Sequence, residues 1–223
     1  NFFNEKPANV PYVCEEFVVG DIYSYDAITD ADCNPLFESC TFWPPSIADI
    51  VNEQRDLWYY TLIDVPEQLR ERGRATVKAF GVNRRFVHLE FFCLKVARKG
   101  LGEVGDFVGL EVNMRPAGGY TPDMMNYAHA TDVYQIYADM VAFNERRVPD
   151  LHMDHYCTYA GRRDIHNYKH SHEEILRRYG NQMAMCERIP DILSGAMGNQ
   201  MYTVHTYSQE ETEELIAFVQ EQN

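Results

Sequence analysis

The stretch RRFVHLEFFCLKVARKGLGEVGDFVGLEVNMRPAGG (residues 84–119) holds two apolar runs joined by a glycine-rich segment. Side chains two residues apart share a face of a β-strand, and the segment KGLGEVGD is short enough to connect an antiparallel hairpin. His88 and Glu90 then share a face on the first strand, and Glu111 and Asn113 share one on the second. If the two faces coincide, the hairpin brings Glu90 and Glu111 close together, with Asn113 beside them.

This set of side chains predicts a site for a hard metal ion. Two neighbouring carboxylates in a half-buried sheet need a compensating cation. Two carboxylates and an amide oxygen suit Mg²⁺ or Mn²⁺ rather than zinc. A solvated sheet face is the alternative for Glu90, Glu111 and Asn113. His88 shares this face, and it either has a functional role or only forms a hydrogen bond to a neighbour. Arg115 is either functional or a structural partner of the carboxylates.

The overall composition limits the classes of partner. The chain has 223 residues and a formal net charge of −14, which argues against a nucleic-acid or anionic-membrane partner. No apolar run is long enough to span a membrane, and no signal peptide is visible. Six cysteines without a CxxC pair indicate reduced thiols and a cytoplasmic location. The sequence leaves open whether the protein forms a homodimer.

The pattern along the chain predicts an α+β fold with an antiparallel sheet and flanking helices. The sequence pattern changes after Pro149, which predicts a domain boundary there. We expect one lobe over residues 1–150 and a smaller α+β domain over residues 151–223. Turn residues and apolar periodicity predict strands over 10–19, 22–29, 35–43, 84–100 and 106–115, helices over 46–60, 66–80 and 131–146, and then three strands and two helices, over 171–179 and 208–222.

The segments HLEFF and LEVNMRPAGG resemble the large-lobe metal site of the ATP-grasp enzymes, especially the branch of biotin carboxylase and carbamoyl-phosphate synthetase. In that branch a glutamate on one strand is followed by E-x-N-x-R on the next. The resemblance implies that Glu90, Glu111 and Asn113 bind the metal ion. It also implies that Arg115 is catalytic and serves the acyl-phosphate end of the substrates.

The upstream segment VCEEFVVGDIYSYD resembles the family's hinge strand, which contacts adenine and ribose. The resemblance implies that Glu15, Glu16 and Val18 bind ATP, the latter two through backbone groups. Family members carry a small lobe with phosphate-gripping lysines before this strand, and nothing before Pro11 matches it. We therefore expect a C-terminal fragment of an ATP-grasp protein, inactive alone and binding nucleotide weakly at best.

By resemblance, the full-length protein is an ATP-dependent ligase. Such an enzyme uses ATP with Mg²⁺ or Mn²⁺ to phosphorylate a small-molecule carboxylate, and an amine or thiol nucleophile then displaces the phosphate. Two alternatives stay open. One is a bicarbonate-activating enzyme like biotin carboxylase or carbamoyl-phosphate synthetase, and the other is a nucleotide-binding module that kept the metal site without turnover.

Two further motifs lie after residue 150. The segment AGRRD, which ends at Asp164, offers a basic rim for an anionic substrate, although surface Arg-Arg pairs are common. The segment HNYKHSH contains His166, His170 and His172 without a carboxylate or cysteine at ligand spacing, which favours a solvated loop over a metal site.

Overall fold

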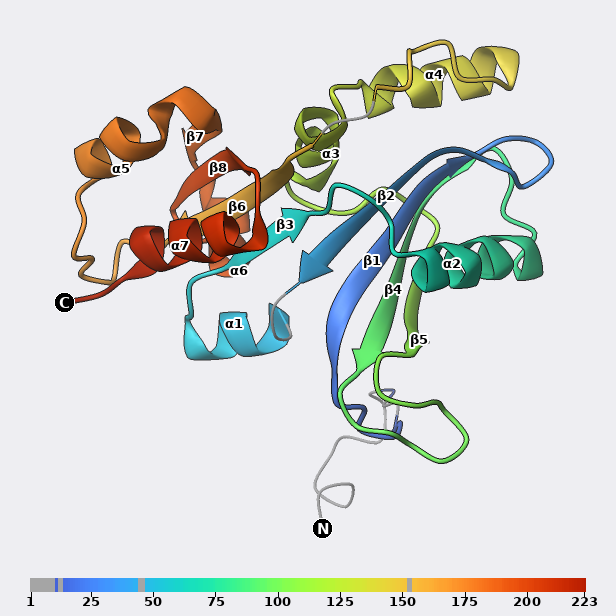
Figure 1. Cartoon of the computed structure of the whole chain (residues 1–223), viewed down its shortest axis with the longest axis horizontal. Coiled ribbons are helices and arrows are strands. Elements are labelled where there is room, and N and C mark those ends of the chain that lie inside the picture. The colour runs from blue at the N-terminus through green and yellow to red at the C-terminus, as the bar shows by residue number, and fades with distance from the viewer. Residues whose placement is uncertain (1–10, 12–13, 44–46, 152–153) are drawn as a thin grey trace.

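The computed structural model describes residues 11, 14–43, 47–151 and 154–223, whose strands form one eight-stranded sheet (Figure 1). The strands lie in the order β5-β4-β1-β2-β3-β6-β8-β7, and all seven neighbouring pairs are antiparallel. The strands are β1 (Gly20–Thr29), β2 (Pro35–Trp43), β3 (Trp58–Thr61), β4 (Arg85–Leu94), β5 (Phe107–Asn113), β6 (Tyr156–Arg162), β7 (Met183–Arg188) and β8 (Gln200–Thr206). The helices are α1 (Ile47–Glu53), α2 (Glu67–Ala79), α3 (Thr121–His129), α4 (Val133–Phe143), α5 (His172–Tyr179), α6 (Asp191–Met197) and α7 (Gln209–Gln220), with a short 3₁₀ helix η2 (Gly180–Gln182). The predicted α+β class is confirmed.

One face of the sheet is covered by α2 at the β1 and β4 end. The helix buries Leu69 and Val77 against Tyr25 and Leu89, which alternation places on this face. Gly73 lets the helix approach closely, because a Cβ atom at this position would lie 2.4 Å from Cγ of Tyr25. The same face is covered at the β6 and β8 end by α5 and α7, in a separate cluster of buried apolar residues.

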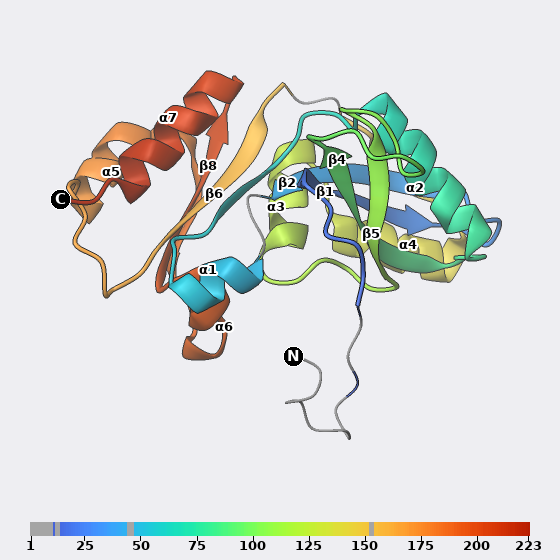
Figure 2. The ribbon, with the colours of Figure 1, turned by 90° about the horizontal axis from the view of Figure 1, so that it is seen from below.

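The opposite face is covered by α3 and α4. Met125 of α3 and Ile136 and Met140 of α4 pack against Ile28 and Phe37 of the sheet. Figure 2 shows β1, β2 and β4 lying between α2 on one side and α4 on the other. The sheet is therefore the middle layer of three, and the acidic residues of β4 and β5 lie near one edge of it.

Two predicted elements are wrong. The helix expected over 46–60 ends at Glu53, and Trp58–Thr61 forms β3 instead. Its aromatic side chains suit a strand that pairs with both β2 and β6. The strand expected over 10–19 is not formed in its described part, because residues 14–19 belong to no strand and β1 begins only at Gly20.

The expected division into residues 1–150 and 151–223 stays a prediction about domain organisation. The strand pairing joins the two ranges, since β3 of the first pairs with β6 of the second over Trp58–Thr61. In the ranges that the structure describes, no helix has the length and apolar character needed to cross a bilayer.

Candidate functional site

The β4–β5 hairpin carries the predicted acidic residues at matched positions. Glu90 lies directly opposite Glu111, and His88 lies opposite Asn113. The register shifts immediately after Glu90, where Leu110 is skipped. Residues that are directly opposite in an antiparallel pair point to the same face. The predicted juxtaposition of the two glutamates on one face is therefore confirmed, while their role as metal ligands stays a prediction.

A buried chain of hydrogen bonds holds Glu90 from the β1 side. β1 places Asp26 opposite His88 and Ser24 opposite Glu90. Nδ1 of His88 lies 2.8 Å from Oδ1 of Asp26, and Nε2 of His88 lies 3.1 Å from Oε1 of Glu90. The Ser24 hydroxyl donates to Oδ2 of Asp26 over 2.6 Å. Because Asp26 is fully buried, this chain anchors Glu90 to the core of the sheet.

His88 is held in its charged form. Burial alone would lower the pKa of His88, but the carboxylates of Asp26 and Glu90 outweigh burial and raise this pKa to about 10. A protonated imidazole donates from both ring nitrogens, so His88 donates one hydrogen bond to each carboxylate. His88 therefore hydrogen-bonds its neighbours, which is one of the two alternatives given by the sequence analysis. These hydrogen bonds fix the orientation of Glu90.

The acidic cluster has an excess of negative charge. Asp26, Glu90 and Glu111 have three formal negative charges and His88 one positive charge, which leaves a net charge of −2. Like charges directly opposite each other destabilise a sheet. A divalent cation between Glu90 and Glu111 would neutralise the cluster, so the arrangement suits a bound dication.

Asn113 provides a test of whether such a cation fits. Its Nδ2 atom is buried and has no hydrogen-bond partner among the described residues. The two ends of an amide are alike in shape, so rotation of the group would present the carbonyl oxygen instead. Within the described ranges, no three His, Cys, Asp or Glu side chains are grouped so that they could hold a metal ion alone. An ion at Glu90 and Glu111 therefore needs Asn113 or ligand oxygens, and this donor set fits Mg²⁺ or Mn²⁺.

A cavity of about 560 Å³ lies over the same face of the sheet. One wall is the sheet itself, where the ring of Trp43 stacks on Tyr59 with centroids 4.4 Å apart. Another wall is α6, which brings residues from the end of the chain to this site. The polar lining residues are His88, Glu90, Glu111 and Arg115, and the apolar ones are Ile22, Trp43, Leu57, Tyr59, Leu110, Ile192, Leu193, Ala196 and Met197. Apolar walls with a few placed polar groups are typical of small-ligand sites.

Arg115 follows β5 and lines this cavity. Its Nη1 atom donates 2.9 Å to the carbonyl oxygen of Pro116, and in the part of the chain that the structure describes it forms no ion pair with Glu90 or Glu111. The alternative in which Arg115 is a structural partner of the carboxylates is therefore not supported. The loop that follows Arg115 packs closely against α6 at Gly119, where a Cβ atom would lie 2.8 Å from Cε of Met197. The φ angle of Gly119 is +60°, a conformation that favours glycine.

The chain is similar to known proteins in its structure, and not in its sequence. No protein-family model matches the sequence, and no curated protein matches it. The chain is similar to L-amino acid ligase from Bacillus licheniformis, with a TM-score of 0.63, 13% identity, and coverage of 91% of this chain and 53% of that one. It is also similar to phosphoribosylglycinamide synthetase from Anaerococcus prevotii, with a TM-score of 0.61, 10% identity, and coverage of 92% and 52%.

A third similar structure is the biotin carboxylase domain of 2-oxoglutarate carboxylase from Hydrogenobacter thermophilus, in complex with MgADP and bicarbonate. The TM-score is 0.55 at 12% identity, with coverage of 86% of this chain and 43% of that one. The chain has the ATP-grasp fold. At these identities the likeness shows the fold alone, and the chain spans about half the length of the ATP-grasp structures it matches.

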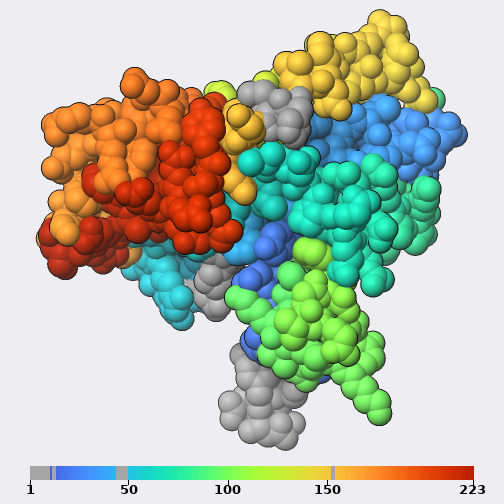
Figure 3. Space-filling model, in the orientation of Figure 1, coloured from blue at the N-terminus to red at the C-terminus, as the bar shows by residue number. Residues whose placement is uncertain are grey.

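The adenine contacts implied by the ATP-grasp resemblance lie apart from the cavity. Glu15, Glu16 and Val18 precede β1 and are not among the lining residues. Oε1 of Glu16 instead lies 2.7 Å from Nη1 of Arg98, whose Nη2 donates to the carbonyl oxygen of Phe17 over 2.9 Å. Arg98 belongs to the β4–β5 connection, which projects at the lower end of the molecule in Figure 3. The role of these three residues stays a prediction.

Proposed function

We propose that this chain is the metal- and nucleotide-facing part of an ATP-dependent ligase that activates a carboxylate as an acyl phosphate for attack by an amine or a thiol. The observation that carries the proposal is the pairing of Glu90 with Glu111 on a cavity wall, beside Asn113, whose buried Nδ2 atom has no hydrogen-bond partner among the described residues. Similar solved structures include a ligase, a synthetase and a domain with bound MgADP, which supports this class of chemistry.

Each residue then has a distinct task. Glu90, Glu111 and Asn113 hold the ion, and His88 fixes Glu90 by its link to Asp26. Mg²⁺ held by these residues would supply positive charge that offsets the negative charge of the transferred phosphoryl group. The guanidinium of Arg115 presents a planar fork of donors that suits a carboxylate or phosphoryl oxygen at the acyl end.

Titration of Mn²⁺ followed by electron paramagnetic resonance tests the metal site on this chain. Protein-bound Mn²⁺ loses the sharp signal of the free ion, so the method detects weak binding. We expect ADP to strengthen Mn²⁺ binding to the wild-type chain. The double substitution Glu90→Gln with Glu111→Gln should weaken that binding by about tenfold or more, on the scale of one lost charge-assisted contact.

The control is Glu71→Gln, which removes one carboxylate charge from an exposed position of α2 and should leave Mn²⁺ binding unchanged. Equal Mn²⁺ affinity in the double variant and the wild type would contradict the metal site. Turnover is tested separately in the natural gene product, by release of ADP or phosphate in the presence of amino acids, small organic acids or bicarbonate. Dependence of release on an amino acid or organic acid together with an amine or thiol supports the ligase. Release with bicarbonate alone would shift the assignment to a bicarbonate-activating enzyme.

A further inference from the structure

A second cavity, of about 510 Å³, lies at the other end of the sheet. It is lined by Arg162, Arg163, Asp164, His166, Tyr168, His172, Arg188, Gln200 and Tyr202, none of which lines the cavity of Glu90 and Glu111. Because side chains alternate between faces along β6, Arg162 lies on the same face of the sheet as Ala160 and Tyr202. The helices α5 and α7 cover this face. Glu90 lies on the opposite face, so the two cavities are separate sites.

Arg162 is a buried cation without a carboxylate partner. It is 7% exposed, and in the described part of the chain it forms no ion pair. Its Nη1 atom donates to the carbonyl oxygen of His170 over 2.7 Å, its Nε atom donates to that of Val219, and its guanidinium carbon lies 4.3 Å from the ring centroid of Tyr168. Nη2 has no hydrogen-bond partner among the described residues. Buried arginine is normally paired with an anion, because an uncompensated buried charge is costly.

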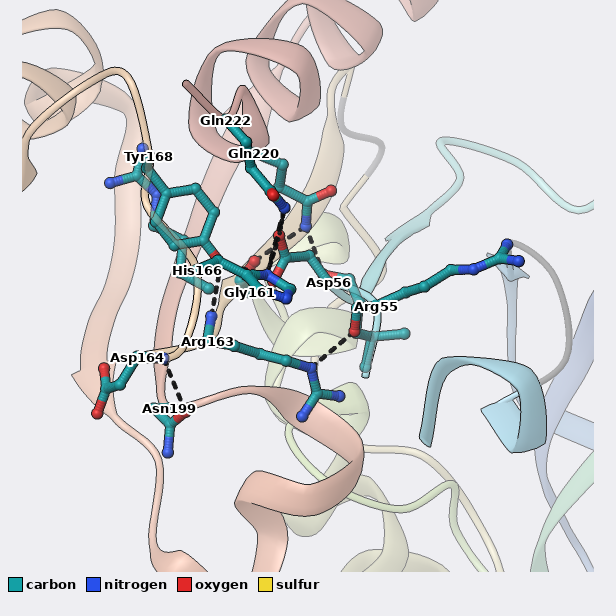
Figure 4. Close-up of polar contacts among 12 residues, drawn as sticks. Arg55, Asp56, Gly161, Arg163, Asp164, His166, Tyr168, Asn199, Gln220 and Gln222 are labelled. Atoms are coloured by element: carbon teal, nitrogen blue, oxygen red, sulfur yellow. Dashed lines mark hydrogen bonds and ion pairs between the residues drawn. The ribbon is translucent and has the colours of Figure 1, made fainter. Parts of the chain in front are cut away.

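The adjacent Arg163 is a buried arginine in which each of the three guanidinium nitrogens donates to an acceptor. It is also 7% exposed, but its side chain donates to the carbonyl oxygens of Arg55, Ser194 and Gly195 at 2.8, 3.3 and 3.1 Å. Figure 4 shows this side chain reaching across to Arg55. Structural contacts therefore account for Arg163, and they do not account for Arg162.

The acidic groups around the cavity are already committed to other partners. Asp164 pairs with Arg188 through both carboxylate oxygens. Asp56 is not among the lining residues, and it accepts from the Tyr168 hydroxyl over 2.6 Å and from His166 over 3.2 Å, a cluster drawn in Figure 4. A cavity with a surplus of cationic groups is unusual in a chain whose formal net charge is −14.

Further donors stand at the rim of the cavity. Nδ1 of His172 lies 2.9 Å from the Tyr202 hydroxyl, an arrangement that orients the imidazole and leaves its Nε2 atom available. His172 and Arg188 are both exposed, and Arg188 keeps three of its five N–H groups beyond the two that bind Asp164. Gln200 pairs opposite Arg162 in the β6–β8 register. Guanidinium and imidazole donors around one cavity are suited to an oxyanion.

We propose that this cavity binds a small oxyanion, the phosphate or carboxylate group of a metabolite, with Arg162 as the buried charge partner and His172 and Arg188 as rim donors. The site does not depend on the proposed ligase chemistry, since it shares no residue with the metal cavity. The sequence predicted a basic rim for an anionic substrate from the AGRRD segment as a whole. The proposed site is a defined cavity, and within that segment Arg162 has the main role.

Isothermal titration calorimetry of the 223-residue chain tests this site, with inorganic phosphate and malonate as probes and chloride at matched ionic strength as the reference. We expect phosphate, malonate or both to bind the wild-type chain with a measurable dissociation constant. Arg162→Met should weaken that binding about tenfold or more. The control Arg177→Met removes an exposed arginine of α5 outside the lining and should leave the affinity within about twofold.

A response to phosphate alone would identify a phosphoryl ligand, and a response to malonate alone a carboxylate, and both outcomes uphold the oxyanion site. Absence of binding by either probe in the wild type would overturn it, as would equal affinity in Arg162→Met. Circular dichroism shows whether Arg162→Met folds. If it does not fold, the rim variant His172→Gln with Arg188→Gln decides the matter, because both residues are exposed and their loss should weaken oxyanion binding several-fold.

Discussion

Replacing Glu111 by glutamine should have opposite effects on stability without and with a divalent cation. Residues directly opposite in an antiparallel pair have Cβ atoms about 5 Å apart, and two unit charges at this distance repel by about 0.8 kcal/mol in water. His88 partly neutralises Glu90, so the repulsion that Glu111→Gln removes is about 0.5 kcal/mol. Without metal, the variant should therefore unfold about 1–2 °C above the wild type.

A divalent cation should reverse this order. A ligand at 100 times its dissociation constant stabilises the folded state by about 2.7 kcal/mol, which corresponds to about 5–10 °C for a chain of this size. Glu111→Gln loses one of the two carboxylates and should gain only a small fraction of that increase. The assay is thermal unfolding followed by circular dichroism, with Mn²⁺ and ADP added in steps to both proteins.

The matched control is again Glu71→Gln, which should follow the wild type at every Mn²⁺ concentration. Two results would contradict the proposed role of Glu111. A lower unfolding temperature of metal-free Glu111→Gln would show that Glu111 and Glu90 do not repel each other, and an equal gain from Mn²⁺ in both proteins would show that Glu111 is not a ligand.

Three other predictions concern different parts of the molecule. Arg115→Lys in the natural gene product should lower kcat by about 100-fold and leave ATP affinity within a few-fold, measured by steady-state kinetics and calorimetry, and a collapse of affinity with normal turnover would refute a catalytic role. Burial lowers the pKa of His129 to about 4, so its proton binds more tightly in the unfolded chain, and this residue alone should contribute about 2 kcal/mol less stability at pH 5 than at pH 7, a contribution measured as the difference between the wild type and His129→Gln in urea unfolding at the two pH values. Gly73→Ala should destabilise the fold by about 1 kcal/mol or more despite better helix propensity, because its Cβ atom would meet the ring of Tyr25 at 2.4 Å, and a stabilised variant in urea unfolding would contradict this packing.

Local sequence patterns were sufficient where neighbouring strands are joined by short connections. The pairing of Glu90 with Glu111 follows from alternation and a hairpin, and the structure has that register. The strand β3 was not predictable in the same way, because its four residues are stabilised by pairing with β2 and with the distant β6. The helices α3 and α6 were not predicted either, because both are short and follow segments that contain glycine or proline.

The candidate site shows the same limit. Asp26 lies opposite His88 and holds it across 62 residues of sequence separation, a contact that no local pattern indicates. Alternation along β1 would have placed Asp26 on the correct face only if the β1–β4 pairing had been known. The α6 wall of the cavity depends on packing of the last third of the chain, which no local pattern encodes.

The most direct test of the metal site is anomalous diffraction from crystals of this chain grown with Mn²⁺ and ADP. We predict an anomalous peak between the side chains of Glu90 and Glu111, about 2–2.5 Å from a carboxylate oxygen of each, with the Asn113 side chain adjacent. Bound nucleotide without a peak at this position, or a peak held by other residues, would show that Glu90 and Glu111 do not form the metal site.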